Sequence, residues 1–275
     1  MRDLFFAMYG TGLEWTIWCL LFLLIGIVLL IVSFVKLKKK AKIAGIIISA
    51  LLIWQIVPVG FYWKALFSRT DMSPSELIAA YNEQGKYVYN NNYFGYIKYM
   101  KLAANTSLIP WQKGAYYCEV AKEFMESKNG LKAVEYYNKA FKYIKDYKYY
   151  ICWKFAGLTY YLSGDINTAI KITEALGLHY TSSIYYTAIE NYPKALEYMN
   201  YYIEFNPNSS YAYARRAYIN NKLGYHDYEL GDYKRAVSMA KNEKEKMYVL
   251  EYLKIGENEL NWHQQAAKNM GFVKD

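Results

Sequence analysis

Two long apolar segments occupy the first part of the chain. Residues 15–35 and residues 43–63 each run for 21 positions without a formal charge. Because roughly 20 apolar residues in a helix suffice to cross a hydrocarbon core of about 30 Å, each segment is predicted to span a membrane. The residues between them, 36–42, include five lysines. The pattern therefore predicts a hairpin of two transmembrane helices within residues 15–67, joined by a basic loop.

The charges around the two segments predict their orientation. Short loops rich in lysine stay in the cytoplasm, which places loop 36–42 inside and both chain termini outside. The tail 1–14 is short and nearly neutral and can be translocated, whereas Lys64 and Arg69 favour the opposite orientation. A signal peptide is the alternative for the first segment, but its apolar run exceeds the usual length of about 7 to 15 residues. We therefore expect an integral protein of the cytoplasmic (inner) membrane whose large C-terminal region is extracytoplasmic.

From residue 68 onward, the chain changes from apolar runs to a helical pattern rich in aromatic residues. Of the 33 tyrosines, 31 lie at Tyr81 or later. Ser73 followed by Pro74 is typical of a helix start, with the serine as the cap and the proline in the first turn. Residues 68–275 are therefore predicted to form an all-α domain.

Small and aromatic residues recur in this domain at spacings that define helix-turn-helix units. The clearest unit contains Trp153, Ala156, Gly157, Tyr160, Gly164, Asp165 and Ala169. Another unit begins at Gly114 and contains Tyr117, Ala121, Phe124, Ala133, Tyr137 and Ala140, with Asn129-Gly130 as its turn. This order resembles the tetratricopeptide repeat (TPR) family, in which small residues mark the close approach of paired helices and aromatic residues fill the gaps between repeats. The resemblance implies an α-solenoid, a stack of helix pairs whose concave face binds a protein or peptide.

The later units are less regular. The third unit contains Tyr192, Ala195, Tyr202 and Pro207. The fourth begins near Ser210, and both Leu223-Gly224 and Leu230-Gly231 resemble its turn, so seven residues are inserted. We expect the insertion to lengthen the first helix of the pair, because two helical turns nearly preserve its face. Residues 74–105 and 244–270 are expected to be helical pairs that cap the two ends of the array.

In TPR domains the concave face is lined mainly by the first helix of each pair, and the resemblance carries this surface onto several positions of the chain. The candidate partner-binding residues are Lys122, Met125, Lys154, Leu158, Tyr161, Tyr211, Arg215 and Tyr218. Tyrosine suits recognition because it offers a large contact area at little entropic cost, although the same tyrosines can pack helix against helix. The carboxylate clamp of some family members is present only in fragments, but Lys122, Lys154 and Arg215 can attract an acidic segment.

The remaining residue chemistry does not favour catalysis. His179, His226 and His263 are far apart, and the sequence holds no metalloprotease, phosphate-loop or hydrolase-elbow motif. We therefore expect no enzyme activity, no cofactor, no metal site and no small-molecule substrate. The net charge of +9 indicates a basic surface beside anionic lipid rather than a nucleic-acid groove. Cys118 and Cys152 are expected to be small buried apolar residues rather than members of a disulfide framework.

Together these features predict a membrane-anchored TPR-like adaptor or scaffold. Its extracytoplasmic solenoid would bind a protein or peptide partner in an envelope assembly or secretion process. The alternative is a membrane-associated inhibitor, such as a toxin-immunity protein, whose spans bind a foreign membrane-active protein. Growth protection that survives deletion of residues 73–275 would favour the inhibitor.

Overall fold

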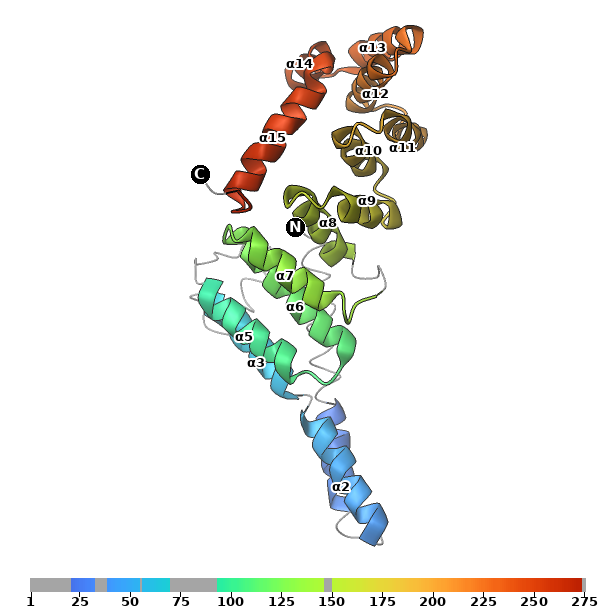
Figure 1. The fold of residues 1–275 in the computed structure, drawn as a ribbon. Helices are drawn as coiled ribbons and strands as arrows, with labels where there is room; N and C mark the ends of the chain where they lie inside the picture. The colour runs from blue at the N-terminus through green and yellow to red at the C-terminus, as the bar shows by residue number, and fades with distance from the viewer. Residues whose placement is uncertain (1–20, 33–38, 55, 70–92, 146–149, 274–275) are drawn as a thin grey trace. The chain divides into compact units, whose positions relative to one another are not determined.

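The computed structural model describes residues 21–32, 39–54, 56–69, 93–145 and 150–273. Within these ranges every regular element is a helix and no strand occurs, as the sequence predicts (Figure 1). The tail 1–14, the two ends of the first apolar segment and the helix start at Ser73 lie outside the described residues.

The chain divides into two compact units. Unit 1 comprises the residues up to Ser127 together with Glu135–Ile151, and unit 2 comprises Lys128–Val134 together with Cys152–Asp275. Unit 1 therefore combines the apolar helices with the first helices of the tyrosine-rich region.

The second apolar segment forms a helix that is long enough to cross a membrane. Ile43–Ala65 is a stretch of 23 residues with a mean hydropathy of 2.2, and within the described residues no other helix meets both conditions. It covers most of α2 (Lys39–Trp54) and α3 (Ile56–Arg69). Of the first predicted span, residues Leu21–Val32 form a shorter apolar helix. The structure thus shows one helix with the length and composition of a span, where the sequence predicts two.

The two apolar segments contact each other through a glycine. A Cβ atom added to Gly26 would lie 3.2 Å from Ile53 Cγ1 and 3.3 Å from the carbonyl oxygen of Ser49, both on α2. Ser49 is fully buried and donates its hydroxyl to the carbonyl of Gly45 at 2.7 Å. Absence of a side chain at Gly26 is what permits this close approach, as small residues do in packed membrane helices.

The end of the apolar helix packs on the helices that follow it. α5 (Tyr93–Thr106) lies along α3, and α6 (Pro110–Glu126) lies along α5. Trp54 donates its indole N–H to the carbonyl of Thr106 at 3.0 Å, and the rings of Tyr62 and Tyr116 are 5.8 Å apart. Val59 and Ala65 are buried, whereas the large side chains of Ile43, Ile47, Ile48 and Leu51 are about half exposed. Within unit 1, most of the exposed large apolar side chains of the described residues therefore lie on α2 and on the shorter apolar helix Leu21–Val32.

Unit 2 is built from helical hairpins that pack in sequence order (Figure 1). Its helices are α8 (Tyr150–Leu162), α9 (Ile166–Ala175), α10 (His179–Ala188), α11 (Tyr192–Phe205), α12 (Ser210–Lys222), α13 (His226–Met239), α14 (Glu243–Leu250), a short 3-10 turn η1 (Tyr252–Lys254) and α15 (Ile255–Asn269). The preceding helix α7 (Gly130–Ala140) contributes residues to both units. α10 packs on α9 and α11, and α12 packs on α11 and α13. This arrangement agrees with the expected stack of helix pairs.

The turn between α8 and α9 forms as its sequence predicts. Gly164 has φ +89°, a left-handed conformation that costs glycine little. Asp165 then caps α9 by accepting a hydrogen bond from the N–H of Thr168 at 3.1 Å. At the crossing of the two helices, Gly157 is buried against Ile172, and Ala169 is fully buried.

The insertion in the fourth pair does not lengthen the first helix, so that prediction is wrong. α12 ends at Lys222, because Gly224 adopts φ +74° and the N–H of Tyr225 bonds to the carbonyl of Asn220 at 2.9 Å, the pattern of a Schellman cap. The extra residues instead belong to α13, and Gly231 lies within that helix. The helix ends at the first of the two turn-like sequences, because the residue after Gly224 makes the capping hydrogen bond to Asn220, whereas Gly231 lies inside α13.

The C-terminal segment does not behave as a simple terminal cap. α14 packs on α12 and α13, as a capping helix would. The chain then reverses through η1, and α15 runs back along the side of α10 that is opposite to α11 (Figure 1). At its end, Met270 accepts a hydrogen bond from the N–H of Gly130 at 2.7 Å. The expectation of a capping pair over 244–270 therefore holds for α14 and not for α15.

Cys118 and Cys152 are buried, as expected, but both are disulfide-bonded. The prediction that they are only small apolar residues is wrong in this respect. Sequence spacing alone does not reveal how closely the sulfur atoms approach, and that approach decides whether a disulfide forms.

Candidate functional site

The predicted partner-binding residues lie in two groups. Lys122 and Met125 are on α6 in unit 1, where Met125 is buried and the Lys122 ammonium lies 4.0 Å from the carboxylate of Glu119. The remaining six residues, Lys154, Leu158, Tyr161, Tyr211, Arg215 and Tyr218, are on α8 and α12 in unit 2. On α8, Lys154 is exposed and Leu158 is partly exposed. The structure brings Tyr161 and Arg215 to one surface through contacts with α15.

Arg215 is the most constrained residue of this surface. Its side chain is completely buried, and its guanidinium makes a two-point ion pair with the carboxylate of Glu259 on α15. The second of these bonds, from Nη2 to Oε2, is 3.0 Å long. The Nε atom is buried and has no hydrogen-bond partner among the described residues. Burial lowers the pKa of the guanidinium, but the charge and hydrogen bonds of Glu259 more than offset this, so the pKa is raised and the group stays charged.

A tyrosine ring also lies beside the guanidinium. Arg215 Cζ lies 5.6 Å from the ring centroid of Tyr180 on α10, within the range of a cation–π contact. Tyr248 on α14 packs edge-on against Tyr211 at 4.8 Å. Burial, followed by interaction with Tyr180, raises the pKa of Tyr248. The guanidinium of Arg215 thus has one ring face and one carboxylate beside it, and the Glu259 carboxylate is the group of opposite charge that pairs with it.

A second contact with α15 forms at Tyr161. Its ring stacks on Tyr185 of α10 at 4.2 Å and meets the His263 ring edge-on at 4.6 Å. The ring nitrogen Nε2 of His263 lies 3.0 Å from the backbone carbonyl of Tyr161, so it donates a hydrogen bond there in the tautomer that carries a proton on Nε2. Together with Arg215, these residues form what we call the α15-facing surface: Tyr161, Tyr180, Tyr185 and Arg215.

Tyr218 contacts the start of α15. A Cβ atom added to Gly256 would collide with the Tyr218 hydroxyl, so only glycine allows this approach. Burial is the main cause that raises the pKa of Tyr218 to about 12. Four predicted residues, Tyr161, Tyr211, Arg215 and Tyr218, therefore contact α14 or α15.

Alkaline titration is expected to report the burial of Tyr161. Burial, and then the charge of Glu259, raise its pKa to about 12, whereas tyrosine in an unfolded chain ionises near 10. Between about pH 10 and 12 the folded chain keeps a proton that the unfolded chain loses, so stability is complete below pH 10 and falls as the pH rises through 12. Stability measured against pH should fall less steeply for Tyr161→Phe than for the wild type. Tyr228→Phe, at a position that is 73% exposed, is the control, and an equal slope for the wild type and Tyr161→Phe would contradict the expectation.

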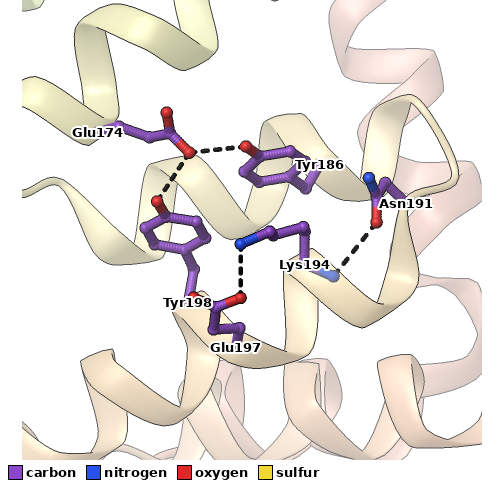
Figure 2. Close-up of polar contacts among 6 residues, drawn as sticks. All are labelled: Glu174, Tyr186, Asn191, Lys194, Glu197 and Tyr198. Atoms are coloured by element: carbon purple, nitrogen blue, oxygen red, sulfur yellow. Dashed lines mark hydrogen bonds and ion pairs between the residues drawn. The ribbon is translucent and has the colours of Figure 1, made fainter.

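A separate polar cluster ties α9 to α10 and α11 (Figure 2). The carboxylate of Glu174 accepts hydrogen bonds from the hydroxyls of Tyr186 at 2.6 Å and Tyr198 at 2.7 Å, and the two rings stack 5.5 Å apart. Burial and these hydrogen bonds raise the pKa of both tyrosines, that of Tyr186 to about 12. Nearby, Lys194 pairs with Glu197 at 2.8 Å. Since Glu174 serves both hydroxyls, this cluster fixes the spacing of the helices.

For the contacts with α15, the sequence predicted the residues on α8 and α12 but not the residues on α15 that they contact. It did not single out Glu259 or assign a contact to His263 on α15, and it missed Tyr180 and Tyr185 on α10. The available signal was charge: Arg215 was expected to attract an acidic segment, and α15 carries Glu257 and Glu259. Among the described residues, no group of three or more metal-binding side chains lies together.

The sequence matches no protein-family model and no curated protein. The properties of the α15-facing surface itself are therefore the basis for assigning a function.

Proposed function

We propose that the chain is a membrane-anchored, TPR-like adaptor whose helical array binds a protein or peptide partner through the first helix of each pair. The observation that carries this proposal is the α15-facing surface, which already holds a helix along α8, α10 and α12. A surface that binds one helix through a buried charge and aromatic rings has the chemistry of a helix-recognition site. The placement of small and aromatic residues at the expected positions of the pairs supports the TPR-like assignment.

The membrane anchor in this proposal is a two-helix hairpin. The contact of Gly26 with α2 supports it, because the two apolar segments lie against each other. The exposed apolar side chains of α2 support it as well, since they would face lipid. The basic loop then lies in the cytoplasm, and the helical array lies outside.

Cysteine chemistry offers a test of this location. Disulfides persist in oxidising compartments and are rare in the cytosol, so disulfide-bonded Cys118 and Cys152 favour an extracytoplasmic array. We expect neither thiol to react with a maleimide in protein taken from cells under denaturing, non-reducing conditions, and both to react after reduction. Mass spectrometry of the two peptides measures this. Full labelling without reductant would place the array in a reducing compartment.

Photo-crosslinking of the full chain in its native membrane tests partner binding. Lys154 on α8 and Lys171 on α9 are both exposed, and only Lys154 belongs to a first helix. A crosslinking side chain at Lys154 is expected to give a discrete protein adduct, and the same group at Lys171 is the matched control. Adducts of equal yield at both positions, or none at Lys154, would contradict the adaptor. Adducts confined to positions on α2 would favour the inhibitor.

A further inference from the structure

α15 contacts the rest of unit 2 through a small number of side chains, as a bound helical peptide does. Ile255 and Ala267 are its buried residues, while Leu260 and Trp262 remain more than half exposed. Its polar contacts include the ion pair of Glu259, the contact of His263 with α8 and, at its C-terminal end, the hydrogen bond from Gly130 to Met270. A helix that buries little of its surface opens at a lower free energy than the core on which it lies.

The surface beneath α15 is unsuited to being left uncovered. Arg215 lies beside the ring of Tyr180, and its only ion pair within the described residues is the one with Glu259. Its unsatisfied Nε atom leaves no other hydrogen bond to compensate for burial. If another helix covered Arg215 without supplying an acidic side chain, the guanidinium would be buried as an unpaired charge, which is strongly unfavourable. Any ligand that displaces α15 must therefore bring a carboxylate to the same place.

We propose that the α15-facing surface binds an amphipathic helix of a partner protein that presents a carboxylate to Arg215, and that α15 occupies this surface in cis until the partner displaces it. This inference rests on the proposed adaptor function and names the chemistry of its ligand. Arg215 selects the acidic side chain by its two-point geometry. Tyr161 and Tyr185 receive a ring or an imidazole from the same helix, as they receive His263 here.

A labelled peptide of residues 251–273 with blocked ends is the probe, and the detergent-solubilised full chain is the receptor. The Glu259→Gln chain is expected to bind this peptide at least about tenfold more tightly than the wild type, because its own α15 competes less well and a larger fraction of receptors is open. Glu257→Gln, the same change at an exposed position on α15, is expected to bind like the wild type. Fluorescence anisotropy measures all three affinities.

Changing the peptide instead of the receptor provides the second arm. On the Glu259→Gln chain, a peptide with glutamine in place of Glu259 is expected to bind at least about tenfold more weakly than the natural peptide. Hydrogen exchange of the Glu259→Gln chain should rise in α15 and stay unchanged in α10 and α11. Equal affinities of the wild-type and Glu259→Gln chains, or of the two peptides, would overturn the proposal. So would a wild-type dimer that dissociates on Glu259→Gln, since a second copy would then be the occupant.

The two proposals can fail separately. Peptide binding with the expected dependence on Glu259, but without an adduct from Lys154 in native membranes, would support the carboxylate-selective surface and contradict the adaptor. An adduct from Lys154 whose yield is the same in wild type and Glu259→Gln would support the adaptor and contradict displacement of α15.

Discussion

Glu259→Gln is expected to lower the free energy of unfolding of unit 2 by about 3 kcal/mol. The substitution keeps the shape of the side chain but leaves the guanidinium of Arg215, which is fully buried, without an opposite charge. Glu259 is itself about a quarter exposed, so the cost should lie near the lower end of what is found for breaking buried pairs. Urea unfolding of the full chain in detergent, followed by circular dichroism, measures it.

The double variant Arg215→Met, Glu259→Gln is the informative control. Removing both charges and keeping a similar side-chain volume is often neutral or even stabilising, because neither desolvated charge remains. We therefore expect the double variant to recover most of the loss caused by Glu259→Gln alone. A double variant that is less stable than Glu259→Gln would mean that Arg215 contributes through something other than its pair with Glu259.

Glutamate at the crossing of α8 and α9 is expected to cost on the order of 3 kcal/mol or more. At Gly157 even a Cβ atom would lie 3.3 Å from Ile172 Cγ2, and Ala169 has no exposed surface. A carboxylate at either position would be desolvated in a tight helix contact. Gly231→Glu is a matched control, since Gly231 lies within α13 and is exposed with open space around it.

The control should change stability in the other direction. Glycine inside a helix costs up to about 1 kcal/mol relative to better helix formers, so Gly231→Glu is expected to be neutral or slightly stabilising. Thermal unfolding compares the three variants. Equal melting of Gly157→Glu, Ala169→Glu and the wild type would mean that α8 and α9 do not cross at these residues.

Local signals explain why the helix pairs could be predicted from the sequence. A glycine that must adopt positive φ and an Asp that caps the next helix are adjacent at Gly164-Asp165, and both act within a few residues. The same local chemistry decides the end of α12 at Gly224, but there the sequence offered a second turn-like site at Gly231. Choosing between them required knowing which glycine closes a capping hydrogen bond, and the repeat pattern does not contain that information.

Contacts between distant residues explain what could not be predicted. Arg215 and Glu259 are 44 positions apart, and Tyr161 and His263 are 102 apart. No periodicity links them, because the reversal at η1 sets where α15 lies. The disulfide-bonded state of Cys118 depends in the same way on spatial approach. The candidate residues Tyr211, Arg215 and Tyr218 thus share one helix, α12, while the residues that contact them belong to a segment expected to cap the array.

The packing of α5 on α3 has a mechanical consequence for unit 1. Trp54 and Tyr62 fasten the apolar helix directly to Thr106 and Tyr116. A change in the rotation of that helix would therefore move α5 and α6 with it. If that helix spans a membrane, as proposed above, a bilayer of different thickness would change its tilt and so displace α5 and α6, because these contacts are made by side chains of the apolar helix itself.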